Sequence, residues 1–273
     1  MKIKFYATVL FVFLTACSTI DINERDVFDA HRTISPQEFE TAGYSLNETF
    51  FKTEDGVEIN SWILKNDQPK ATILYLGGNG FLMVKSRPLI ELYSRLPVNV
   101  VFIDYRGYGK SSGEPSVRGV QLDAEAAYEI ALEISEESNS ELIVHGHSMG
   151  SFLSAHIADT RQVSGYILES PVSEIDSWTK GLVPWLLRPF IRFNIDEAIS
   201  SQDNLSRVKR ISEPLLIIGG DSDEITPFSM AEDLYKKSVS TQKEIVRIAG
   251  GGHNDLPVSI NYFESINAFI GSL

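Results

Sequence analysis

The sequence contains a single cysteine among its 273 residues. One cysteine excludes an internal disulfide, a Cys-x-x-Cys pair and a zinc cluster built on thiolates. Basic residues are also scarce, since 24 Lys and Arg face 37 Asp and Glu and leave a net charge of −13. This acidic balance argues against nucleic acid, and against an anionic membrane surface, as an electrostatic partner.

Long apolar runs and low-complexity stretches are absent as well. The apolar run at residues 5–16 has about 12 residues, whereas a helix that spans a bilayer needs ~20. With 19 Gly and 11 Pro, the composition is neither collagen-like nor typical of disordered chains. A chain of this length with 43% hydrophobic residues buries a core as one large domain, with room for an inserted subdomain.

The N-terminus has the features of a bacterial export signal. Two lysines precede the apolar run, which ends in the tetrapeptide LTAC at residues 14–17. This tetrapeptide resembles the lipoprotein box, in which the signal is cleaved before a cysteine that then carries acyl chains such as palmitate. We therefore predict a lipoprotein signal peptide over residues 1–16, a lipid anchor on Cys17 and a polar tether over residues 17–45. An ordinary signal peptide or a frayed apolar terminus is the alternative.

Short apolar runs alternate with longer helical patterns through the rest of the chain. Runs that suit buried strands occupy residues 71–76, 98–103, 141–145, 165–168 and 214–218. Helical spacing marks residues 84–96, 119–137 and 149–160. A hairpin signal over residues 49–64 comes first. This order predicts an α/β domain over residues 46–273, with a mostly parallel central sheet and helices on both faces.

One interval breaks the alternation. Residues 171–213 separate two predicted strands by roughly 40 residues, far beyond the usual 2–6. The interval is rich in aromatic residues and includes Trp178 and Trp185. We predict a small helical cap over the C-terminal edge of the sheet, with these two tryptophans as candidate substrate-binding residues. Plain core packing and contact with lipid are the alternatives for its aromatic side chains.

Residues 146–150 form the pattern Gly-x-Ser-x-Gly, with Ser148 at its centre. The pattern follows a predicted strand directly and opens onto a helical run. This is the strand–turn–helix setting that places a serine on a sharp turn with its oxygen exposed. The flanking glycines are needed there because a Cβ would collide with the neighbouring strand and helix.

A serine hydroxyl needs a base to take its proton and a carboxylate to hold that base. In proteins with this turn, the acid and then the histidine follow the serine along the chain. His253 is the only histidine after position 156, which makes it the candidate base. Asp223 is the preferred acid and Asp221 the alternative. His147 lies within the turn itself, where we expect its side chain to point into neighbouring packing.

Five signatures occur in a fixed order along residues 49–272. They are GGNG at 77–80, DYRGYGKS at 104–111, GHSMG at 146–150, GGDSDEITP at 219–227 and GGHND at 251–255. Together they resemble the α/β-hydrolase superfamily, and within it the serine-aminopeptidase-like and monoglyceride-lipase-like branch.

The resemblance implies an α/β-hydrolase fold. No cluster of His, Asp and Glu in the sequence has metal-ligand spacing, so we predict no cofactor and no metal. Ser148 would be the nucleophile, Asp223 the orienting acid and His253 the base. The backbone N–H groups of Asn79 and Met149 would form the oxyanion hole. The family usually has His-Gly before the oxyanion residue, whereas this chain has two glycines at 77–78, which leaves open how that loop is held rigid.

These observations predict a serine hydrolase, lipid-anchored to a membrane of the bacterial cell envelope, which cleaves carboxylic esters of acyl or lipid-like character through an acyl-enzyme. A peptidase, a thioesterase or an acyltransferase with the same triad is the first alternative. A non-catalytic binding lipoprotein on the same fold is the second. The sequence does not distinguish the inner from the outer membrane.

Overall fold

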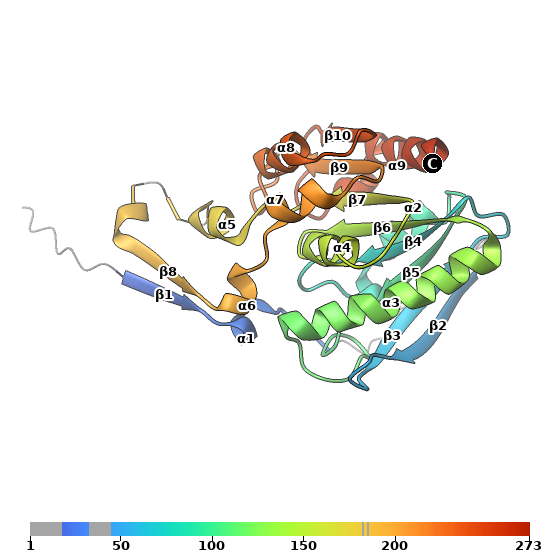
Figure 1. The fold of residues 1–273 in the computed structure, drawn as a ribbon, viewed down its shortest axis with the longest axis horizontal. Helices are drawn as coiled ribbons and strands as arrows, with labels where there is room; N and C mark the ends of the chain where they lie inside the picture. The colour runs from blue at the N-terminus through green and yellow to red at the C-terminus, as the bar shows by residue number, and fades with distance from the viewer. Residues whose placement is uncertain (1–17, 33–44, 182, 185) are drawn as a thin grey trace, which may run out of the picture.

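The computed structural model describes residues 18–32, 45–181, 183–184 and 186–273. Its centre is an eight-stranded sheet in the order β10-β9-β7-β6-β4-β5-β3-β2 (Figure 1). The predicted hairpin is present as β2 (Ser45–Lys52) paired antiparallel with β3 (Glu58–Lys65), and β3 also pairs antiparallel with β5. The remaining neighbours in the sheet are parallel. The predicted fold class is therefore confirmed.

Five of the parallel strands form at the short apolar runs that predicted them: β4 (Ala71–Leu76), β5 (Val98–Ile103), β6 (Glu141–His147), β7 (Gly165–Glu169) and β9 (Leu215–Gly220). The sixth, β10 (Lys243–Ile248), mixes charged with apolar residues and was not predicted. Every residue of β4, β5, β7 and β9 is buried, because helices cover both faces of the sheet.

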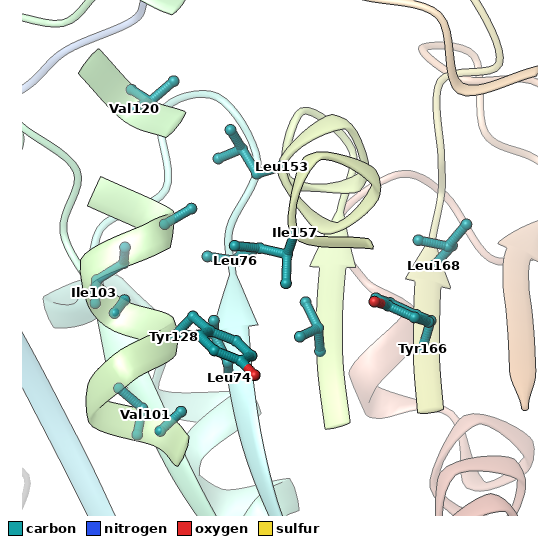
Figure 2. Packing of buried hydrophobic residues seen from close by; sticks show 14 of the residues in the cluster. Leu74, Leu76, Val101, Ile103, Val120, Tyr128, Leu153, Ile157, Tyr166 and Leu168 are labelled. Carbon is teal, nitrogen blue, oxygen red and sulfur yellow. The ribbon is translucent and has the colours of Figure 1, made fainter. Parts of the chain in front are cut away.

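Two hydrophobic clusters bind the helices to the sheet, one on each face. On one face lie α3 (Val117–Ser138), α4 (Gly150–Ala158) and α8 (Phe228–Lys237). Figure 2 shows Tyr128 of α3 and Ile157 of α4 packed beside Leu74 of the sheet. The other face carries α2 (Arg87–Tyr93) and α9 (Ile260–Ser272). The prediction of helices on both faces is confirmed.

The helix predicted over residues 84–96 is shorter in the structure. A 3-10 turn, η1 (Met83–Lys85), precedes α2, and Pro88 lies in the first turn of α2. Proline is suited to a first turn, where its missing N–H costs nothing, but it disrupts a helix interior. The helix therefore begins only at Arg87.

The cap interval contains short helices and one strand. The helical pieces are α5 (Ile175–Gly181), η2 (Arg188–Phe190), α6 (Glu197–Ser200), α7 (Asn204–Arg207) and η3 (Val208–Arg210). The strand β8 (Ile191–Ile195) was not predicted. It pairs in parallel with β1 (Ser18–Ile22) in a two-stranded ribbon that projects from the side of the molecule (Figure 1).

The first described residues correct the prediction of a tether over residues 17–45. Residues 18–22 form a strand, and α1 (Glu24–Val27) follows. The alternating apolar residues Ile20 and Ile22 match the alternation in β8, and this short period-2 pattern gives the two segments a common apolar face. Cys17, the predicted anchor, lies outside the described residues. Within the described ranges, no helix is both long enough and apolar enough to cross a membrane.

Candidate active site

Ser148 lies on a sharp turn between β6 and α4. Its φ is +52°, a left-handed conformation that a serine adopts only where the surrounding structure enforces it. A Cβ on Gly146 would lie 2.2 Å from the Ser154 Oγ, and one on Gly150 would lie 1.9 Å from the Leu76 carbonyl oxygen. The turn therefore requires glycine on both sides, because a Cβ at either position would collide with the neighbouring strand or helix.

The structure brings the three predicted triad residues together. The Nε2 atom of His253 lies 2.9 Å from the Ser148 Oγ, and its Nδ1 lies 2.8 Å from the Asp223 Oδ2. An ionised carboxylate only accepts hydrogen bonds, so Nδ1–H donates to Asp223 and Nε2 is left to accept the serine proton. The geometry is that of a nucleophile, a base and an orienting acid.

The side chain of Asp223 is fully buried, and hydrogen bonds from its own loop hold the carboxylate in place. Its Oδ1 accepts the backbone N–H groups of Ile225 and Thr226 at 2.9 and 2.8 Å. Burial alone would raise the pKa of this carboxyl, but the hydrogen bonds from His253 and Thr226 outweigh it and lower the pKa to about 2. Asp221, the alternative acid, accepts the N–H of Gly250 instead.

Thr226 is a member of the site that the sequence analysis missed. Its Oγ1 lies 2.8 Å from the Asp223 Oδ2, 3.0 Å from the His253 Nδ1 and 3.0 Å from the Ser170 carbonyl oxygen. The hydroxyl thus contacts both the acid and the imidazole that the acid orients. The available signal was Asp223 itself, because an aspartate side chain commonly accepts the backbone N–H two residues on and so closes a turn with the residues that follow it.

The other histidines near the turn do not compete with His253 as the base. The Nε2–H of His147 donates to the backbone carbonyl of His253 at 3.0 Å, and burial lowers the pKa of its imidazole, which favours the neutral form. His145 lies in the core between the Tyr93 hydroxyl and the Glu169 carboxylate, as expected of a hydrogen-bonded core residue. The hydrogen bond from His147 therefore supports the backbone of His253, the candidate base.

The loop after β4 carries Asn79, one of the two candidate oxyanion donors. The Asn79 Oδ1 accepts the backbone N–H of Asp29 at 2.8 Å and the Tyr108 hydroxyl at 2.9 Å. Its Nδ2 donates to the Val27 carbonyl at 2.7 Å. Within the described residues, the backbone N–H groups of Asn79 and Met149 are not used in loop or turn hydrogen bonds. Both donors are therefore free to meet a developing negative charge.

The two glycines that replace the family's His-Gly pair bring this loop close to the nucleophile. A Cβ on Gly78 would lie 2.9 Å from the His147 Nδ1 and 3.2 Å from the Ser148 Cβ, and one on Gly77 would lie 2.2 Å from the Phe81 ring. The second glycine thus allows the loop backbone to pack directly on the turn, while the Phe81 ring covers the first. Asn79 and the N-terminal segment supply the support that the sequence analysis left open.

A cavity of about 520 Å³ adjoins the site. It lies between the oxyanion loop and the loop after His253, and its wall includes Gly78, Asn79, His147, Glu169 and Asn254. The buried Glu169 accepts hydrogen bonds from the His145 Nε2 and the Tyr262 hydroxyl. Burial raises the pKa of Glu169, but His147 and His145 counteract it, and the net pKa is lowered.

Trp178 on α5 is half-buried, and its indole N–H donates to the Ile225 carbonyl at 3.0 Å. It packs on a small apolar cluster that includes Phe152 of α4 and Met230 of α8. The cap is thereby joined to the loop that carries Asp223. Trp185, the second predicted substrate-binding residue, lies outside the described residues.

In the part of the chain that is described, no group of three His, Cys, Asp or Glu side chains has the arrangement to hold a metal.

Comparisons with known proteins identify relatives in several organisms. Residues 67–203 match the family model described as serine aminopeptidase, S33. The protein bem46 of Schizosaccharomyces pombe is 31% identical over 225 residues, which are 80% of this chain and 74% of that protein. The alpha/beta hydrolase domain-containing protein 17B of Xenopus laevis is 30% identical over 203 residues, which are 74% of this chain and 66% of that protein.

Solved structures share the fold. The esterase Pf2001 of Pyrococcus furiosus has a TM-score of 0.72 and 20% identity, with 89% of this chain and 98% of that chain covered. A soluble variant of monoglyceride lipase from Saccharomyces cerevisiae, solved with a substrate analogue, has a TM-score of 0.66 and 18% identity, with 87% and 97% covered. With the family model matching half of its residues, this chain belongs to the serine aminopeptidase S33 family of α/β-hydrolases.

Proposed function

We propose that the protein is a serine hydrolase that cleaves carboxylic esters through an acyl-enzyme. The observation that carries this proposal is the continuous hydrogen-bonded path from Ser148 through His253 to Asp223. Such a path activates a hydroxyl that is otherwise a weak nucleophile.

The first half of the reaction forms the acyl-enzyme. The Ser148 Oγ attacks the ester carbonyl carbon while its proton passes to the His253 Nε2, and the ionised Asp223 stabilises the resulting imidazolium. Negative charge develops on the carbonyl oxygen, where the N–H groups of Asn79 and Met149 would each contribute ~2.7–4 kcal/mol. The C–O bond of the ester then breaks, and the leaving alkoxide takes the proton from Nε2.

The second half repeats these steps with water as the nucleophile. His253 takes one proton of the water as its oxygen attacks the acyl carbon, and the same two N–H groups receive the charge again. Collapse of this intermediate breaks the bond to the Ser148 Oγ, which recovers its proton from Nε2. The products are the carboxylic acid, the alcohol and the original enzyme.

We infer an acyl or lipid-like substrate from the surroundings of the triad. The cap joins the main domain through apolar side chains such as Ile175 and Phe152, and the cavity beside the oxyanion loop has the volume of a small organic ligand. The fold neighbours named as an esterase and a monoglyceride lipase are consistent with this class. A lipid anchor on Cys17 would hold the enzyme at a membrane of the cell envelope.

The test of this proposal is hydrolysis of p-nitrophenyl esters of increasing acyl length by the signal-stripped protein. We expect turnover to extend to chains of eight carbons or more, and turnover of only the shortest esters would contradict the lipid-like class. Glycerol and amines added as competing acceptors distinguish hydrolysis from acyl transfer. Parallel assays on peptide and thioester substrates test the alternatives that use the same triad.

A further inference from the structure

Four large apolar side chains are exposed on the β1–β8 ribbon and in the residues that immediately precede β8. The exposed fractions are 62% for Leu186, 49% for Leu187, 37% for Phe190 and 42% for Ile20. The first three immediately precede β8, and the register places Ile20 opposite Phe193 within it. We call residues 18–20 and 186–192 the ribbon tip. Figure 1 shows the ribbon standing clear of the main sheet.

The ribbon tip has basic residues and no acidic ones, although the whole chain has a net charge of −13. Arg188 and Arg192 are exposed, and neither forms an ion pair within the described residues. The Nε–H of Arg188 donates to the Val183 carbonyl, and the terminal nitrogens have no partner among the hydrogen bonds of the described chain. A guanidinium with free N–H groups is suited to phosphate.

The position of the ribbon tip in the chain favours a lipid surface as its partner. Ser18, the first residue of β1, directly follows Cys17, where the proposed lipid anchor is attached. One residue spans at most ~3.6 Å, so acyl chains on Cys17 would bring the tip to the surface of the bilayer. Exposed leucine and phenylalanine flanked by arginine are typical of protein surfaces that lie in the lipid headgroup region.

We propose that the ribbon tip is a lipid-contacting surface. Leu186, Leu187, Phe190 and Ile20 enter the boundary between headgroups and acyl chains, and the two arginines bind lipid phosphates. Because β8 belongs to the cap and β1 leads to the segment that holds Asn79, this contact orients the candidate active site toward the membrane. The orientation rests on the proposed anchor and on the proposed function, whereas the lipid contact itself is measurable without either.

The experiment measures vesicle binding by the mature chain that carries Cys17→Ser, so that no lipid is attached. Phosphatidylcholine vesicles are used, because their zwitterionic surface neither attracts nor repels an acidic protein strongly. We expect this protein to co-sediment with the vesicles. The double variant Leu186→Ser/Leu187→Ser should bind at least about tenfold more weakly, since it removes two apolar side chains from the contact.

The matched control is Val239→Ser/Ile260→Ser, which changes two side chains of similar exposure, 56% and 60%, away from the ribbon. This control should bind vesicles as the parent does. Absence of binding by the parent, or equal loss in both double variants, would overturn the proposal. The proposal would also be overturned if the tip variant bound vesicles as the parent does but had a different oligomeric state, measured by light scattering. That result would favour self-association through the ribbon tip.

Hydrolysis of a short, water-soluble ester is measured on the same three proteins. Equal rates of ester hydrolysis show that the tip variant is folded and that it has lost only its binding to vesicles. If vesicle binding follows the prediction while no ester is cleaved, the proposed function fails and the lipid contact stands. If ester is cleaved while vesicles are not bound, the lipid contact fails and the proposed function stands.

Discussion

The backbone N–H of Asp29 donates to the side-chain oxygen of Asn79, 50 residues further along the chain, at 2.8 Å. The Nδ2–H of the same Asn79 side chain donates to the Val27 carbonyl. The segment that follows the predicted anchor therefore holds the loop that carries a candidate oxyanion donor. Because β1 of this segment also pairs with β8 of the cap, a single stretch of chain contacts both structures around Ser148.

The first prediction concerns the support of this loop. Asn79→Ala keeps the backbone N–H but removes the three hydrogen bonds of the side chain. We expect kcat for ester hydrolysis to fall by about 10–100-fold with a smaller change in KM, because the donor acts mainly on the transition state. The control is Asn23→Ala, whose exposed side chain donates a hydrogen bond to Asp26 and forms no other among the described residues. Equal kcat for the wild type and Asn79→Ala would contradict a positioning role for the side chain.

The second prediction concerns the turn around Ser148. In Gly150→Ala, the new Cβ would lie 1.9 Å from the Leu76 carbonyl oxygen, a backbone atom that cannot move without displacing β4. We expect a loss of at least about 3 kcal/mol in the free energy of unfolding, measured by urea denaturation. Gly271→Ala is the matched control, because nothing lies within 4 Å of its Cβ position on α9. This substitution should be neutral or stabilise by up to about 1 kcal/mol, and equal effects at the two positions would refute the steric argument.

The third prediction follows from the lowered pKa of Asp223. The pKa is about 2 in the folded protein and 3.8 for an ordinary aspartate, so the ionised form is favoured by folding. The difference corresponds to about 2 kcal/mol of stability, present in full at pH values well above 3.8 and lost as the pH falls through 3.8 toward 2. The unfolding free energies of the wild type and Asp223→Asn should therefore differ most near neutral pH and converge in acid.

The same substitution separates the structural role of Asp223 from its role in catalysis. Without the carboxylate, the imidazole of His253 loses its orienting partner, and we expect kcat to fall on the order of 10³–10⁴-fold at pH 7. Asp221→Asn serves as the control, since within the described part of the chain the Asp221 carboxylate accepts hydrogen bonds from the N–H of Gly250 and the Ser222 hydroxyl and from no other group. A larger loss of activity in Asp221→Asn than in Asp223→Asn would show that Asp221, and not Asp223, is the acid of the triad.

The sequence was informative wherever local pattern and chemistry coincide. Apolar runs such as residues 71–76 predicted five of the six parallel strands to within a residue or two, because their composition suits a strand covered on both faces. The sixth, β10, was not predicted, because its sequence mixes charged with apolar residues. The glycines around Ser148 predicted the turn, since the chemistry of the site itself demands them. The positions of His253 and Asp223 followed from their order along the chain.

Features that depend on distant partners were not predictable. The sequence predicts a tether where residues 18–22 form a strand, because these five residues carry only a weak alternation until β8 lies beside them. The contacts of Asn79 with Val27 and Asp29 join positions about 50 residues apart, which no local pattern records. Thr226 gave a local signal, but its contact with His253 arises only when the two loops meet.

Covalent labelling of Ser148 tests the central claim most directly. The signal-stripped protein and its Ser148→Ala variant are treated with a fluorophosphonate and examined by intact mass. One adduct on the wild type and none on the variant is the predicted result, because only a serine activated by His253 attacks phosphorus at a useful rate. A folded wild type that gains no adduct, or a variant that gains as much, would contradict an activated Ser148 and favour a binding protein on a hydrolase fold.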